Sequence, residues 1–264
     1  MALRTKIEWT DHTANLWHGC TKVHEGCQNC YAANFSRWLG RDIWGNDKPR
    51  RFIISTWGNL ELFQKLAAHK NAIHRVFMGS MKDVFERPMP LVDHHGVQLG
   101  TNTGDLRQQL FQNISNGMYP NLDFLLLTKR PSNINKYIPE AWISNPPKNV
   151  MFGTSPVNQA TANILIRQLG NVNGRRFLSV EPQLDRLTLL PWLRAGVLDW
   201  VIVGGESGRK KRIYNTDWAR QLRDECKITR TPFFFKQVDG VKTIPKDLMV
   251  REFYKKENGQ TTID

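Results

Sequence analysis

The chain has 264 residues, 40% of them hydrophobic, which is enough to form the core of one large domain. No apolar run reaches about 18 residues, and the N-terminus becomes polar and acidic too early for a signal peptide, so we expect a soluble cytoplasmic protein without membrane contact. Lys and Arg number 37 against 24 Asp and Glu, and this net charge of +13 favours either a polyanionic partner or a solvated basic surface.

Short apolar runs of strand length recur along the chain, and amphipathic segments separate them. The first strand is expected within residues 6–17, and the others are Arg75–Ser80, Asp123–Arg130, Asn149–Ser155, Arg176–Pro182, Asp199–Ser207 and Pro232–Gln237. Helical periodicity marks Leu60–Lys70, Gly104–Asn116, Asn158–Gly170 and Asn215–Lys227. About seven strands that alternate with helices predict a parallel α/β fold. The pattern fits a doubly wound sheet and a full or partial (β/α) barrel equally, and in both folds ligands bind at the carboxyl ends of the strands.

We expect a single domain over residues 1–264. Neither internal repeats nor low-complexity segments interrupt the alternation of strands and helices. Two irregular segments that are polar and contain several glycines, 39–59 and 93–104, are predicted to be surface insertions or lids rather than domain boundaries.

Three of the four cysteines lie within eleven residues, in a loop over residues 18–31: Cys20, Cys27 and Cys30. So few cysteines in a long chain do not make a disulfide framework, which directs attention to metal sites. A zinc site would need a fourth ligand from His18, His24 or Cys226. A 4Fe–4S cluster held by three cysteines would instead leave one iron open to a cofactor or substrate. Unrelated buried thiols are the third interpretation, and we expect Cys226 to be such a core thiol on its helix.

The residues that follow the loop predict a helix. Tyr31, Phe35, Trp38 and Leu39 fall on one helical face, and we expect this apolar face to pack on the sheet. Between the first strand and the first helix of a barrel, the cysteine loop would lie over the carboxyl mouth of that barrel.

Motifs in a fixed order run through most of the chain: "IEWTDHTANLWHGCTKVHEGCQNCYA" is followed by "GSMKDVF", "LLLTKRP", "RFLSVEP", "DWVIVGGESG" and "CKITRTPFFFKQ". With these motifs the chain resembles the radical S-adenosylmethionine (radical SAM) proteins, and most closely a phage-associated family, formerly of unknown function, that has a three-cysteine loop followed by Tyr-Ala. The resemblance implies a partial or complete (β/α) barrel with a 4Fe–4S cluster on Cys20, Cys27 and Cys30. SAM would bind the open iron, and an electron from a reductase or a flavodoxin-type donor would cleave it to a 5′-deoxyadenosyl radical that removes hydrogen from the substrate. A phage-encoded member would act in the cytoplasm of the host cell.

The resemblance also implies which residues contact SAM: Tyr31, Ser80, Met81, Asp83, Ser155, Asn158 and Glu181. In this assignment Ser80, Asp83 and the carbonyl of Met81 bind the amino group of SAM, and Ser155 and Asn158 bind its ribose. Ordinary turns between strands and helices would use the same residue types. The chain departs from the common pattern of the superfamily in three ways. Six residues rather than three separate the first two cysteines, Asn29 replaces an aromatic residue that contacts adenine, and "GSMKD" replaces Gly-Gly-Glu.

Polar and charged side chains at other strand ends are candidates for the substrate side: Lys129, Arg130, Glu206, Ser207, Lys236 and Gln237. The basic residues would make the mouth cationic, whereas the alternative for Glu181 and Glu206 is an ion pair with a nearby Lys or Arg. The loop after Ser207 would add a nucleic-acid patch, unless its cations are ordinary solvated residues: Arg209, Lys210, Lys211 and Arg212.

Together these features lead to the hypothesis of a radical SAM enzyme whose substrate is a nucleic acid, with a base in phage DNA as the favoured target. The enzyme would modify this base or rearrange an existing modification. Two alternatives remain open. One is a radical SAM enzyme that acts on a peptide or a small metabolite, and the other is a zinc-containing nucleic-acid binding module.

Overall fold

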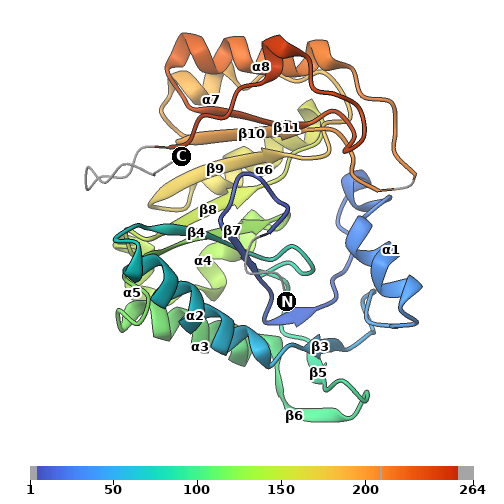
Figure 1. The fold of residues 1–264 in the computed structure, drawn as a ribbon, viewed down its shortest axis with the longest axis vertical. Coiled ribbons are helices and arrows are strands. Elements are labelled where there is room, and N and C mark those ends of the chain that lie inside the picture. Colours follow the sequence, from blue (N-terminus) through green and yellow to red (C-terminus); the bar gives the residue numbers. More distant parts are fainter. Residues whose placement is uncertain (1–4, 209, 255–264) are drawn as a thin grey trace.

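One curved parallel sheet of seven strands forms the centre of the molecule (Figure 1). The structure is a computed structural model that describes residues 5–208 and 210–254. Along the sheet the strands follow their order in the chain, and every neighbouring pair is parallel. The strands are β1 (His12–Ala14), β4 (His74–Met78), β7 (Leu122–Thr128), β8 (Val150–Thr154), β9 (Arg175–Val180), β10 (Trp200–Gly204) and β11 (Phe233–Gln237).

A strand order that matches the chain order makes this sheet singly wound. Each crossover turns the same way to reach the next strand, so the connecting helices collect on the outer face of the sheet. With β1 and β11 as its two edges, the sheet is an open half barrel, which confirms the predicted partial barrel of about seven strands over the doubly wound alternative.

The helices that connect the strands cover the outer face, and Figure 1 shows α2 and α3 on one side and α7 and α8 on the other. In the described part of the chain, none of the helices is both long and apolar enough to span a membrane. The connecting helices are α2 (Ser55–His69), α3 (Thr103–Ser115), α4 (Ile134–Tyr137), α5 (Glu140–Ser144), α6 (Gln159–Gly170), α7 (Leu190–Arg194) and α8 (Thr216–Thr229), with short 3-10 turns η1 (Glu25–Cys27), η2 (Pro131–Asn133) and η3 (Lys246–Leu248).

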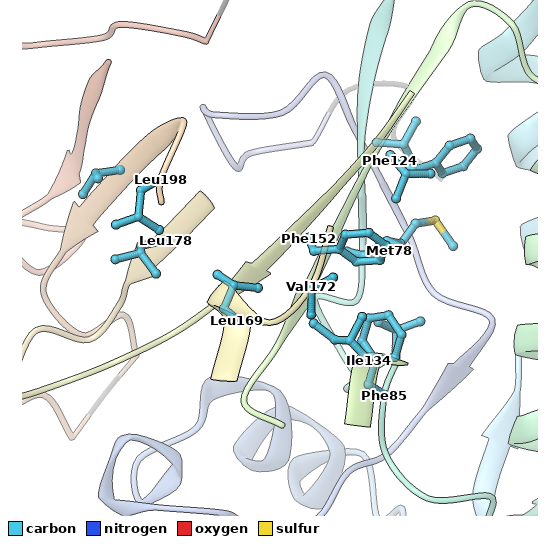
Figure 2. Close-up of a cluster of buried hydrophobic side chains, with 14 of the residues drawn as sticks. Met78, Phe85, Phe124, Ile134, Phe152, Leu169, Val172, Leu178 and Leu198 are labelled. Carbon is cyan, nitrogen blue, oxygen red and sulfur yellow. The ribbon is translucent and has the colours of Figure 1, made fainter. Parts of the chain in front are cut away.

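Both faces of the main sheet are buried, which is why its strands are continuous apolar runs in the sequence. On the outer face Met78, Phe124 and Phe152 pack against the helical layer, and Figure 2 shows them near Phe85 and Ile134. On the inner face a second cluster gathers aromatic side chains from alternate positions: Trp9, Phe77, Phe177, Trp200, Phe234 and Tyr254. This aromatic layer fills the inside of the half barrel between its two ends.

A smaller sheet of four strands lies beside the start of the main one and contains β2 (Trp17–His18), β3 (Arg50–Phe52), β5 (Pro90–Val92) and β6 (Gln98–Asn102). The two segments predicted to be insertions or lids, 39–59 and 93–104, contribute β3 and β6 to it. The pairing of β2 with β3 joins segment 39–59 to the strand that leads into the cysteine loop.

The face of helix α1 (Tyr31–Trp38) that is exposed to solvent is the one that the sequence predicts to be buried. Its buried residues are the small ones, Ala32, Ala33 and Ser36, whereas Phe35 is 48% and Trp38 is 76% exposed. The prediction that the aromatic face packs on the sheet is therefore wrong. The physical reason is that α1 covers the open side of the half barrel, where only small side chains fit over the cavity described below (Figure 1).

Candidate functional site

A cavity of about 200 Å³ lies at the carboxyl edge of the main sheet, and we call it the central cavity. Because all seven strands are parallel, the residues that follow them meet at this one edge, although they are far apart in the chain. Its floor is apolar and includes Trp9, Phe77 and Leu127. The predicted site residues that line it are Cys20, Cys27, Cys30, Tyr31, Ser80, Asp83, Lys129, Arg130, Ser155, Glu181, Glu206, Ser207 and Lys236.

Three other predicted site residues hold the surrounding structure together. The carbonyl of Met81 accepts the N–H of Gly19 at 3.0 Å. The side chain of Asn158 caps α6 and donates to the carboxylate of Glu25 in the cysteine loop. Gln237 donates to a backbone carbonyl in the loop after β10 at 3.1 Å. These contacts all lie within the protein, so local structure accounts for the three residues. They do not favour the contacts with SAM or substrate that the sequence predicts.

Arg130 fastens the Cys20 end of the loop to the main sheet. Its Nη1 donates to Asp83 at 2.8 Å and lies 3.8 Å from the Sγ of Cys20, and its Nη2 donates to the carbonyl of Thr21 at 2.8 Å. Burial and nearby carboxylates raise the pKa of the Cys20 thiol, while Arg130 opposes this rise and favours the thiolate. Both oxygens of Asp83 accept hydrogen bonds within the protein, so this residue positions Arg130, a role that differs from the predicted contact with the SAM amino group.

A buried ion pair supports the same end of the cysteine loop as Arg130. Arg50 donates to Glu86 at 2.9 and 2.7 Å, and the two side chains are 0% and 3% exposed. The other donors of Arg50 reach Thr21 and backbone carbonyls of segment 39–59. Gly19 has a φ of +113°, and a Cβ there would lie 2.3 Å from a carbonyl oxygen of the same segment. Segment 39–59 therefore packs against the cysteine loop and supports it.

The Cys27 and Cys30 end of the loop is connected to β10 through Glu206. Arg212 donates to Glu206 from its backbone N–H at 2.8 Å and from Nε at 3.1 Å, and Asn29 donates to the same carboxylate at 3.3 Å. Burial raises the pKa of Glu206, but the hydrogen bonds from Arg212 more than offset this effect and hold the pKa below its usual value. Asn29, which replaces the expected aromatic residue, thus joins the loop to the strand end.

The turn after β4 is linked to both β1 and α1. Tyr31 donates from its hydroxyl to the carbonyl of Ser80 at 2.7 Å, and burial raises the pKa of this hydroxyl. Asn15 donates to the Oγ of Ser80 at 2.9 Å and accepts from the N–H of Met81 at 2.9 Å. Asn15 was not predicted as a site residue, because nothing in the sequence indicates that β1 and β4 are neighbours with their ends in contact.

Glu181 and Lys236 form an ion pair across the inner face of the half barrel. The two groups approach to 2.6 Å, and their side chains are 12% and 19% exposed. Ser179 also donates to Glu181, at 3.2 Å. The pair places one carboxylate and one ammonium group on the wall of the central cavity, as the ion-pair alternative predicts for both Glu181 and Glu206.

Lys82 lines the central cavity and was missed in the sequence, although it stands between two predicted residues of "GSMKD". Its ammonium group donates to the carbonyl of Met78 at 3.3 Å and lies 4.5 Å from the ring centre of Trp17. Burial lowers the pKa of Lys82 to about 7, and Asp83 acts in the opposite direction. The sequence feature that could have identified Lys82 as a site residue is its place in the turn after a buried strand.

The three loop cysteines are free thiols that share one cavity. Within residues 5–208 and 210–254, no group of three or more His, Cys, Asp and Glu side chains is arranged so that it could hold a metal ion. Cys226 is fully buried in α8, where it belongs to the outer core as predicted. The loop therefore offers three thiols to one cavity.

The basic loop after β10 makes a smaller patch than its sequence predicts. Arg212 turns inward to Glu206, and Lys211 donates to the carbonyl of Asp239 at 2.9 Å. Lys210 is exposed, and Arg209 lies outside the described residues. Two of the four predicted cations thus stabilise the loop itself.

Comparison with known proteins assigns the chain to a family. The model of the family described as "Protein of unknown function (DUF5131)" matches residues 4–262, which is nearly the whole chain, and the protein belongs to this family. Neither a curated protein nor a solved structure matches the chain. What the protein does must therefore be argued from the site.

Proposed function

We propose that the protein is a radical SAM enzyme whose substrate is a nucleic acid. The observation that carries this proposal is the position of Cys20, Cys27 and Cys30 on one cavity at the carboxyl edge of a parallel half barrel. These three thiols would hold a 4Fe–4S cluster, which with SAM bound supplies a 5′-deoxyadenosyl radical for hydrogen abstraction.

The residues around the cavity suit this chemistry. Arg130 lies 3.8 Å from the Sγ of Cys20 and favours its thiolate against the effects of burial and nearby carboxylates, and Lys82 lines the same cavity. Glu181 and Lys236 offer a carboxylate and an ammonium group, which complement the amino and carboxylate groups of SAM. Tyr31, Ser80 and Ser155 supply hydroxyl groups on the same cavity for the rest of the cofactor.

The apolar floor would keep water away from the reacting atoms. Trp9 is 2% exposed and Phe77 is 6% exposed, and both line the cavity from below. Exclusion of water protects a reactive radical from side reactions. The indole Nε1 of Trp9 is buried and has no hydrogen-bond partner among the described residues, so it can donate to a polar atom of a bound ligand.

A nucleic-acid substrate is favoured by charge. The chain carries a net charge of +13, and the exposed Lys210 and the cavity-lining Lys129 lie on the carboxyl side of the half barrel. A base that leaves its stack could enter the cavity while the phosphates stay on the basic surface. A base in DNA, modified or rearranged in place, is the substrate we propose, with a reductase or a flavodoxin-type protein as electron donor.

Anaerobic purification and metal analysis test the cofactor. We expect about four irons and four sulfides per chain, brown colour, and 5′-deoxyadenosine when SAM and dithionite are added. Cys27→Ala should lose both the iron and the product. Cys226→Ala is the matched control, because it removes a free cysteine from the core and should keep both. Stoichiometric zinc without iron, or a fully loaded protein that does not cleave SAM, would contradict the proposal.

Binding measurements at several salt concentrations test the substrate class. We expect DNA affinity to fall steeply as salt rises, because phosphate contacts release counterions. A protein that cleaves SAM but shows no salt-dependent affinity for DNA would instead act on a peptide or a small metabolite.

A further inference from the structure

The exposed side of α1 carries aromatic rings whose faces the proposed chemistry does not use. Tyr31, Phe35 and Trp38 are 42%, 48% and 76% exposed, and we call them the α1 ridge. The rings of Phe35 and Trp38 stack with their centres 6.0 Å apart and an interplanar angle of 26°. Exposed apolar surface of this kind is typical of binding sites, since a helix normally turns such residues to the core.

Two arginines, Arg41 and Arg51, lie at the C-terminal end of the ridge and form no ion pair with any other described residue. The backbone N–H of Arg41 donates to the carbonyl of Ser36, which places Arg41 directly after α1. Arg51 lies opposite His18 in the pairing of β3 with β2, so their side chains share one face of the small sheet. Arg50, the neighbour of Arg51 on β3, donates to the carbonyl of Ile43 at 3.1 Å, so β3 packs beside the segment that begins with Arg41. Burial and the charge of Arg51 lower the pKa of Arg41, in agreement with this arrangement.

The surroundings of these arginines lack the acceptors that such groups need. In the part of the chain that the structure describes, Arg41 and Arg51 form no ion pair, and the Nε of Arg51 is buried without a partner. The Nδ1 of the facing His18 is also buried and unpartnered. Neighbouring guanidinium groups repel each other, and an anion between them relieves this repulsion; a phosphate group fits two guanidinium groups well.

The other end of the ridge reaches the central cavity. A Cβ on Gly208 would lie 3.9 Å from that of Tyr31, so the loop with the exposed Lys210 begins beside this ring. The hydroxyl of Tyr31 is turned into the cavity wall, where it donates to Ser80. Figure 1 shows α1 standing next to this loop, on the open side of the half barrel. The ridge therefore leads from the arginine pair to the cavity.

We propose that the α1 ridge and the Arg41–Arg51 pair bind a single-stranded segment of nucleic acid and lead it to the central cavity. A phosphate lies between the two arginines, bases stack on Trp38 and Phe35, and the strand continues past Tyr31. With eight residues, α1 is about 12 Å long, which a few nucleotides can cover. Stacked aromatic rings beside arginines are the usual means by which proteins bind single strands without reading sequence.

This inference rests on the proposed nucleic-acid substrate and names the surface that receives it. An acidic electron-transfer protein is the other partner that a basic and aromatic surface could bind. Charge favours the nucleic acid, because the arginine pair needs a compact anion and the net charge of +13 extends over the whole chain.

Fluorescence anisotropy with a labelled twelve-nucleotide thymidine strand tests the ridge. Trp38→Ala should weaken binding about tenfold through lost stacking. The double variant R41Q/R51Q should weaken it at least about tenfold and reduce the slope of log affinity against log salt by about 1.4, because two phosphate contacts are lost. Two variants on α2 are matched controls and should stay within about twofold of wild type: Leu62→Ala for exposed apolar area and K65Q/K70Q for charge.

Three results would overturn or redirect the account. If the folded ridge variants bind the oligonucleotide as tightly as wild type, the ridge does not receive nucleic acid. If they keep that affinity but lose electron transfer from a reduced flavodoxin, the surface belongs to the electron donor and the proposal is wrong. Wild type that binds the oligonucleotide through the ridge but never forms 5′-deoxyadenosine would sustain this inference and contradict the proposed chemistry.

Discussion

The two ends of the cysteine loop are both held by pairs of arginine and carboxylate, but they differ in burial. At the Cys20 end Arg50 and Glu86 are 0% and 3% exposed. At the Cys27 and Cys30 end Glu206 is 6% exposed, but its partner Arg212 is 34% exposed. A buried charge that loses its partner stays desolvated, whereas water replaces the lost partner of an exposed charge. The first half of the loop is therefore held by a pair that water does not reach, and the second half by a pair that water reaches on the side of Arg212.

Loss of the buried pair should have the largest effect. Glu86→Gln leaves the guanidinium of Arg50 buried without its counter-charge, and we expect the free energy of unfolding in urea to fall by about 3–5 kcal/mol. Asp42→Asn breaks an exposed ion pair with Lys48 in the same segment and should not change the free energy of unfolding measurably. Equal and small effects of both variants would show that burial does not distinguish these pairs.

Arg130→Lys should separate the charge of Arg130 from its shape. A lysine keeps the positive charge but cannot reach Asp83 and the Thr21 carbonyl in the same fork geometry. We expect stability to fall by about 1–2 kcal/mol. Alkylation of Cys20 by iodoacetamide should become faster, because a loosened loop exposes this partly buried thiol, and we expect the gain in access to outweigh the lost stabilisation of the thiolate. Cys226 in the same sample is the internal control, and an unchanged alkylation rate of Cys20 would contradict the role of Arg130 as the anchor of this end.

Glu206→Gln should have a smaller effect that depends on pH. Because the folded state lowers the pKa of Glu206 below 4.5, its stabilisation is fully present above pH 4.5 and is lost as the pH falls through the folded pKa. At pH 7 we expect the free energy of unfolding of Glu206→Gln to be about 1 kcal/mol below that of wild type, since solvent screens Arg212. In acid the two proteins should become equally stable. Thermal unfolding between pH 3 and 8 measures this, and a deficit that persists in acid would refute the electrostatic origin.

Asn29→Ala should have the smallest effect, about 0.5 kcal/mol, because it removes one hydrogen bond of 3.3 Å to Glu206. Combining it with Glu206→Gln in a double-mutant cycle isolates the contact between these two residues. Additive effects would mean that Asn29 does not hold the loop through Glu206.

Much of the fold follows from patterns that are local in the sequence. Each of the six apolar runs overlaps one strand of the main sheet, since strands buried on both faces are apolar throughout. Asn215 is the N-cap of α8 and accepts a hydrogen bond from the backbone of its first turn, which is the common role of asparagine at the start of a helix. The carboxyl-edge rule placed Glu181, Glu206 and Lys236 correctly on one cavity.

What the sequence does not encode locally is which side of an element faces its partner. The aromatic face of α1 was predicted to be buried, but α1 covers a cavity and presents its small residues inward. Likewise, the contacts of Arg50 with Glu86 and of Asn29 with Glu206 join residues 36 and 177 positions apart, which no periodicity indicates. Residue type alone also did not indicate that Asp83 pairs with Arg130.

The most direct test of the central claim is the electron paramagnetic resonance spectrum of the dithionite-reduced protein, recorded before and after addition of SAM. We predict the signal of a reduced 4Fe–4S cluster, absent in Cys27→Ala, whose g values shift when SAM binds the iron that the three cysteines leave open. A fully iron-loaded protein whose spectrum does not change at saturating SAM would contradict the assignment of Cys20, Cys27 and Cys30 as the complete protein ligand set of a SAM-binding cluster.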